Sequence, residues 1–163
     1  METFAIRAVT AFALFISAAA FGAAPGAAPG AAPGAAGPPI RFFADLSPEE
    51  QAATVESPGK GRVEFTLERE TLKFSWQVTF SNLTSPVTIS SVHGPQRPGT
   101  NAPPQFNLAP PGTKSPISGS VVLTESQLQY LLSDRMYVNI HSVKYPDGEL
   151  RGQIHKIAPA VTN

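Results

Sequence analysis

The side chains best suited to metal chemistry in this sequence are its three histidines, His93, His141 and His155. His93 and His141 lie in segments whose alternation is typical of strands, and they form the best-placed pair of ligands. A first-row metal needs three or four converging ligands, and Asp147, Glu149 or His155 could supply the third. The pattern therefore allows a copper or zinc site at His93, His141 and Asp147. The alternative, which we favour, is that His141 is a structural residue bonded to the turn that follows it and that His93 ends a strand.

A second polar group gathers at a predicted hairpin tip, residues 145–148, which read Tyr-Pro-Asp-Gly. With Glu149 and Arg151 beside it, this tip could bind a cation or a sugar. However, Pro followed by Asp-Gly is also what a tight turn demands, and we favour this structural interpretation. Arg151 would then form an ion pair with Glu149 or Asp134. Asn139 is a poor strand former, so its side chain is expected to bond to backbone or to the surroundings of the histidine two residues on.

The sequence excludes several kinds of chemistry. It has no cysteine, which removes disulfides, zinc–cysteine sites and a cysteine nucleophile. Twelve Lys and Arg balance twelve Asp and Glu, which argues against a nucleic-acid binder or a polybasic membrane-surface protein. The motifs of serine hydrolases, zinc proteases and phosphate-binding glycine loops are lacking. Trp76 is expected in the core rather than as a sugar platform, and Asn82-Leu83-Thr84 is a glycosylation sequon that matters only in a eukaryotic secretory pathway.

The first forty residues do not resemble part of a fold. Residues 1–22 combine one basic residue, a short apolar run and small residues, which is the layout of a secretory signal peptide cleaved near Ala20–Ala24. The apolar run is shorter than the ~20 residues that span a bilayer, which argues against a membrane anchor. Residues 23–40 repeat Ala-Ala-Pro-Gly and are expected to form a disordered linker. The folded domain is predicted at 41–157, followed by a C-terminal tail at 158–163.

Alternation of apolar and polar residues with a period of two dominates the predicted domain. It is clearest at 72–80, where five apolar residues in register indicate one buried and one solvated face. This strand should form a hairpin with the alternating residues 62–68. Further strands are predicted at 41–46, 86–93, 106–108, 116–123, 136–143 and 149–157. In the last of these, Leu150, Gly152 and Ile154 should share one face, and the charged residues should lie on the other.

One short helix is expected before the final hairpin. Thr124 fits an N-cap and Gln127 completes a capping box, with three leucines within 128–132 sharing one face. Residues 94–116 hold many prolines and glycines and are expected to form a long loop with a short strand in it. About seven or eight short antiparallel strands with turns between them predict an all-β Greek-key sandwich or barrel.

The C-terminal part of the domain resembles the closing signature of the CHRD (chordin-type) domain family. The residues that carry this resemblance are Tyr137, Asn139, His141, Pro146, Asp147, Gly148, Glu149, Arg151, Gly152 and Gln153. Upstream, the His93-Gly94 step, the Pro-rich loop and the helix follow the family's order, so the resemblance covers about 41–157. The family commonly has a His-x-His pair where this chain has Ser91-Val92-His93, which removes one ligand if that pair holds a metal.

The resemblance implies an extracytoplasmic β-domain. In bacteria the family occurs as single-domain secreted proteins, and this chain has that format; the growth-factor antagonism of the animal repeats does not carry over. We therefore expect a secreted or periplasmic, non-catalytic binding or structural module. Its partner would be an extracytoplasmic protein or an envelope component, with no nucleic acid, no membrane-spanning segment in the mature chain, and no cofactor. One alternative is a copper- or zinc-binding protein, with redox activity as a further option, and another is a surface component that associates through a strand edge.

Overall fold

A computed structural model of the chain describes residues 37–158. The predicted signal peptide and most of the predicted linker lie outside the described residues, as does nearly all of the C-terminal tail. Ile40, which we assigned to the linker, is the first residue of a strand. None of the helices formed by residues 37–158 has the length and hydropathy needed to cross a membrane.

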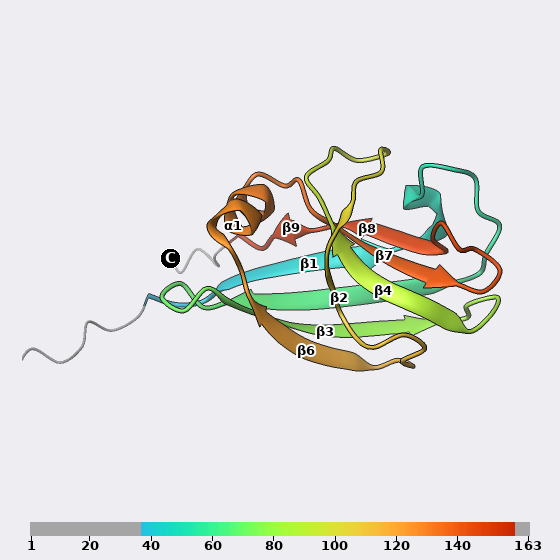
Figure 1. Cartoon of the computed structure of the whole chain (residues 1–163), viewed down its shortest axis with the longest axis horizontal. Helices are drawn as coiled ribbons and strands as arrows, with labels where there is room; N and C mark the ends of the chain where they lie inside the picture. The colour runs from blue at the N-terminus through green and yellow to red at the C-terminus, as the bar shows by residue number, and fades with distance from the viewer. Residues whose placement is uncertain (1–36, 159–163) are drawn as a thin grey trace, which may run out of the picture. The chain divides into compact units, whose positions relative to one another are not determined.

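Nine strands within the described residues form two antiparallel sheets packed face to face, with a single α-helix (Figure 1). This confirms the predicted all-β sandwich. The five-stranded sheet has the order β6-β3-β2-β1-β9, with β1 Ile40–Leu46, β2 Lys60–Leu67, β3 Lys73–Ser81, β6 Ile117–Val122 and β9 His155–Lys156. The four-stranded sheet has the order β5-β4-β7-β8, with β4 Val87–His93, β5 Pro104–Asn107, β7 Tyr137–Ser142 and β8 Leu150–Gln153.

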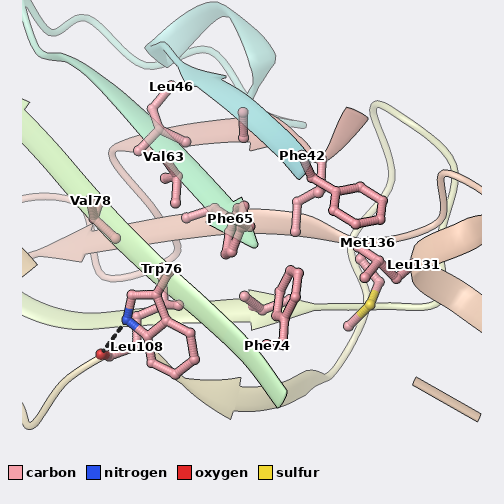
Figure 2. Close-up of a cluster of buried hydrophobic side chains, with 14 of the residues drawn as sticks. Phe42, Leu46, Val63, Phe65, Phe74, Trp76, Val78, Leu108, Leu131 and Met136 are labelled. Atoms are coloured by element: carbon pink, nitrogen blue, oxygen red, sulfur yellow. Dashed lines mark hydrogen bonds between the residues drawn. The ribbon is translucent and has the colours of Figure 1, made fainter. Parts of the chain in front are cut away.

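The predicted hairpin of β2 and β3 is confirmed, and its register places the alternating apolar residues on one buried face. Phe65 lies opposite Trp76, and the rings of Phe65 and Phe74 stack with centroids 4.7 Å apart (Figure 2). The Trp76 indole N–H donates to the carbonyl oxygen of Leu108 at 3.0 Å, which satisfies the one polar atom of this buried side chain. Trp76 is therefore a core residue, as expected. On β6, Gly119 leaves room for the indole, because a Cβ there would lie 2.7 Å from a ring carbon.

The predicted helix is α1, Glu125–Leu132, with the 3-10 turn η1, Pro48–Glu50, earlier in the chain. Its capping box is confirmed: the Thr124 hydroxyl accepts from the Gln127 N–H, and the Gln127 side chain accepts from the Thr124 N–H. Leu131 is buried in the core, but Leu132 is 45% exposed. The predicted leucine face is therefore only partly buried, because Leu128 and Leu131 pack on the core and Leu132 lies at its exposed margin.

The last predicted strand, 149–157, divides between the two sheets. Leu150–Gln153 form β8 in the small sheet, whereas His155–Lys156 form β9 and pair with β1 in the large sheet. Ile154 is buried between them, and its N–H donates to the carbonyl of Met136. The chain therefore crosses from one sheet to the other at this residue.

The two sheets also join along β1 and β8. Ser47, directly after β1, exchanges two backbone hydrogen bonds with Arg151 at 2.9 and 3.0 Å. At the other end of β1, the Ile157 N–H donates to the carbonyl of Arg41 at 2.9 Å. The first and last strands of the domain are thus neighbours, and one side of the sandwich is closed by backbone contact.

Candidate functional site

Five residues of the C-terminal signature lie on the face of the small sheet that is turned away from the core, and Ser91 and His93 of β4 lie on the same face. The five are Tyr137, Asn139 and His141 on β7, and Arg151 and Gln153 on β8. They alternate along β4, β7 and β8 with core residues such as Val92 and Val138, so they point to the opposite face. The strand register brings them into rows across the sheet. One row contains Ser91, Asn139 and Arg151, and the next contains His93, Tyr137 and Gln153.

This outer face is buried, although it is polar. Arg151 is 1% exposed and Gln153 is 6% exposed. The charged residue of β8 lies on the face opposite Leu150 and Gly152, as predicted, but this face is covered, because the segment 94–103 between β4 and β5 lies over the sheet and bonds to it. Alternation indicates which face a residue occupies, but it does not indicate whether another segment covers that face.

Arg151 is the centre of this layer. Its guanidinium carbon lies 3.6 Å from the centroid of the Tyr137 ring, within the range of a cation–π contact. Two of its nitrogens donate to the Asn101 side chain at 3.2 Å and to the Thr100 carbonyl at 2.8 Å. Burial lowers the pKa of Arg151, but an arginine remains cationic near neutral pH. The predicted ion pair with Glu149 or Asp134 was therefore wrong, and neutral oxygens of the covering segment replace a carboxylate.

His93 also belongs to this layer, and both of its ring nitrogens form hydrogen bonds. Its ring lies parallel to that of Tyr137, with centroids 5.1 Å apart. Nδ1 lies 2.8 Å from the carbonyl oxygen of Ala102, and Nε2 lies 2.8 Å from the hydroxyl of Ser91. A carbonyl can only accept, so Nδ1 carries the proton and Nε2 accepts from Ser91. Burial is the main cause that lowers the pKa of His93. The hydrogen bond to Ala102 opposes it, and the proximity of His141 and Arg151 lowers the pKa further, so the neutral ring is favoured.

His141 lies beside His93, with ring centroids 5.8 Å apart, so the structure brings together the two predicted ligands. The His141 Nδ1 also lies 2.8 Å from the carbonyl oxygen of Pro146, which is the turn contact that the structural interpretation expects. Asp147, the predicted third ligand, is exposed, and its backbone carbonyl accepts from Asn139. Within residues 37–158, no group of three His, Asp or Glu side chains is placed to hold a metal ion.

The two other candidates for a third ligand lie elsewhere. Glu149 turns away from the histidines, toward Ser57 and Thr84. His155 lies on β9 in the large sheet, where it is exposed, as expected, and its ring lies 5.9 Å from that of Phe43.

The turn at 145–148 is confirmed, since the Gly148 N–H donates to the carbonyl of Tyr145 at 3.1 Å. Gly148 has a φ of +128°, which favours glycine, and a Cβ there would overlap the side chain of Asn139. Asn139 donates to the Asp147 carbonyl at 3.2 Å and accepts from Gln51 at 2.9 Å. Its side chain therefore fastens the turn to a second loop, which confirms that it bonds to backbone.

Glu149 is buried and joins three segments that are distant in sequence. One of its oxygens accepts from the Ser57 hydroxyl at 2.6 Å and from the Thr84 N–H at 2.7 Å. Burial raises the pKa of this carboxyl, but hydrogen bonds from Ser142, Ser57 and Thr84 outweigh burial and hold it below the ordinary glutamate value. Glu149 is therefore a charged anchor for the loops at this end of the sandwich.

A pocket of about 270 Å³ lies beside the turn, lined by residues 51–55, Asn101 and residues 144–148. Gln51 and Asn101, which line it, were missed by sequence reasoning. Both lie in irregular segments far from the signature, so neither alternation nor spacing could indicate them.

Comparison with known proteins supports the resemblance. Neither the search of curated proteins nor that of solved structures found a match. The family model of the CHRD domain matches residues 42–154, which include most of β1, all of β2 through β8 and every residue of the signature. The chain therefore belongs to the CHRD domain family.

Proposed function

We propose that this protein is an extracytoplasmic CHRD module, secreted or periplasmic, that acts by binding or structural association and not by catalysis. The observation that supports this most is that the signature residues are already bonded to the protein itself. Both nitrogens of His93, the guanidinium of Arg151 and the amide of Asn139 are engaged with loops or neighbouring strands. General acid–base catalysis needs a group free to exchange a proton with a substrate, and these groups hold loops in place instead.

The extracytoplasmic part of the proposal rests on the N-terminal sequence and on the family. The order of a basic residue, an apolar run and small residues in 1–22 is typical of an exported protein. CHRD domains are typically extracellular, and the Ala-Pro-Gly repeat that follows would act as a spacer before the folded domain.

We expect the full chain, expressed with a C-terminal tag in a bacterial host, to be recovered from the periplasm or the medium. Intact mass should show cleavage near Ala20–Ala24, and a panel of hydrolase and oxidoreductase substrates should give no turnover. An uncleaved chain retained inside the cell would contradict the export. A turnover that copurifies with the folded domain and is lost in His93→Ala would contradict the non-catalytic role.

A second candidate function, copper or zinc binding, is favoured by the orientation of the two histidines. In each ring Nδ1 faces a backbone carbonyl, of Ala102 for His93 and of Pro146 for His141. This is the arrangement that orients most metal-binding histidines, because it fixes the proton on Nδ1 and places the lone pair on Nε2. In His93 this lone pair accepts from the Ser91 hydroxyl, which a metal would displace from Nε2. With ring centroids 5.8 Å apart, the pair could provide two nitrogen ligands, and solvent or the Ser91 hydroxyl would complete the coordination.

Metal analysis of the tag-free protein tests this second candidate. If the pair binds metal, the desalted protein should retain about one copper or zinc per chain after loading, and His141→Ala should retain none. His155→Ala is the matched control, since His155 is exposed on the other sheet and should leave retention unchanged. Equal retention in His141→Ala and the unmodified protein, or no retention in either, would remove this candidate.

A further inference from the structure

Strand β6 forms an unprotected edge of the large sheet. It pairs with β3 on one side, and no strand of the described residues lies on its other side (Figure 1). Its sequence, Ile-Ser-Gly-Ser-Val-Val, contains no charge and no proline, and its pairing with β3 has no irregularity. Edges of this kind are templates for pairing with another strand, and proteins usually block them with charges, prolines, bulges or cover.

The other sheet edges in residues 37–158 are blocked in these ways. β9 has only two residues. β8 exchanges backbone hydrogen bonds with Ser47, so its outer side is covered. β5 has four residues, begins with Pro104 and pairs irregularly with β4. The contrast indicates that the open edge of β6 is a surface for pairing.

The backbone groups that face outward on β6 follow from its pairing with β3. The Leu123 N–H donates to the carbonyl of Leu72, and these two residues lie opposite each other in the β3–β6 register. In an antiparallel pair, residues bonded to the neighbour alternate with residues that face away. Ser118, Ser120 and Val122 therefore direct their N–H and C=O groups to the open edge, and all three are exposed.

We propose that β6 pairs with β6 of a second copy of this chain, antiparallel and centred on Ser120. In this register Ser120 faces Ser120 of the other copy, and Ser118 faces Val122. All of these residues have outward backbone groups, so the three pairs form two hydrogen bonds each, about six in all. The side chains in contact are small and uncharged, and Val122, which is 64% exposed, gains a neighbour on the same face.

The length of the strand favours a second copy over a longer strand of another protein. Pro116, which has no N–H, precedes β6, and the helix cap at Thr124 follows it. A ladder on this edge is therefore limited to about the length of β6, and a two-fold copy centred on Ser120 pairs residues 118–122, five of its six residues. The result is one continuous sheet across two domains, which is an isologous interface.

Sedimentation analysis of the full chain over a range of concentrations tests the proposal. The unmodified protein should form dimers. Ser120→Lys and Ser120→Glu each place like charges opposite one another, so each variant alone should dimerise about tenfold more weakly or worse. An equimolar mixture of the two variants should recover dimers, because lysine then faces glutamate.

Gln77→Lys is the matched control. Gln77 is exposed on the same face of the sheet, but it lies on β3, one strand in from the edge, so this variant should dimerise like the unmodified protein. Circular dichroism checks that every variant is folded. A monomeric unmodified protein, dimers that tolerate Ser120→Lys, or a mixture that does not recover association would each overturn the proposal.

Discussion

Gly152→Ala is expected to destabilise the domain by about 3 kcal/mol, at the upper end of what overpacking usually costs. Gly152 lies on β8 where this strand meets β1 of the other sheet, and a Cβ would overlap the carbonyl oxygen of Asp45. The obstacle is backbone, which cannot turn aside as a flexible side chain could. Relief would require separating β1 from β8 and would break the paired hydrogen bonds between Ser47 and Arg151.

Urea denaturation followed by tryptophan fluorescence measures this loss, as a lower midpoint with an unchanged slope. Gly37→Ala is the control, since a Cβ there would meet only the flexible side chain of Arg69 at an ordinary contact distance. It should change stability by less than about 0.5 kcal/mol. A Gly152→Ala protein within about 1 kcal/mol of the unmodified one would show that the two sheets separate more easily here than the structure implies.

Glu149→Gln is expected to lower stability by about 2 kcal/mol near neutral pH, because hydrogen bonds to a charged group are worth about 1.5–3 kcal/mol. Ser57 and Thr84 donate to the same carboxylate oxygen, so an amide oxygen could keep both bonds but would not carry the charge. The amide NH2 would take the place of the second oxygen, which is buried without a hydrogen-bond partner among the described residues. Glutamine has nearly the same shape as glutamate, so the change removes the charge and little packing.

The effect of this substitution should depend on pH. The folded protein holds the pKa of Glu149 below its ordinary value of about 4.5. Stability from a depressed carboxyl pKa is present above the unfolded pKa and is lost as pH falls through the folded one. The gap between the unmodified protein and Glu149→Gln should therefore be widest at pH 6–7 and should narrow below about pH 4.5.

Urea midpoints measured across this pH range give the gap directly. Glu70→Gln is the control, since Glu70 is exposed in the turn between β2 and β3 and should show a small difference at every pH. A gap for Glu149→Gln that stays constant from pH 7 to pH 3 would mean that the charge of Glu149 does not stabilise the fold.

Much of the sandwich could be predicted because its determinants are local. Alternation places Phe65, Phe74 and Trp76 on one face of the large sheet. This pattern requires only that the opposite face of the sheet is solvated. The start of the helix at Thr124 could also be predicted from the sequence, because a capping box involves residues only three positions apart. The division of the last strand could not be predicted, since the alternation of Leu150, Gly152 and Ile154 with polar residues continues to His155 while the backbone changes sheets.

The candidate site was predicted in its members but not in its organisation. Sequence reasoning selected His93, His141, Asn139 and Arg151, but paired Arg151 with a carboxylate and did not indicate its burial. Its burial depends on an irregular, Pro-rich segment that folds over the sheet, and no periodic pattern indicates such a cover. The bond from Gln51 to Asn139 joins residues 88 positions apart, which only the three-dimensional structure reveals.

Because its first and last strands are neighbours, this domain is suited to insertion into other proteins. Because β1 and β9 are paired and Ile157 bonds to Arg41, the chain enters and leaves the domain at nearly one point. A host protein could accept the domain within a surface loop without stretching that loop, and a short linker could join the two ends in a circular permutant. New ends opened in the exposed turn between β2 and β3 would leave both sheets with all their strands.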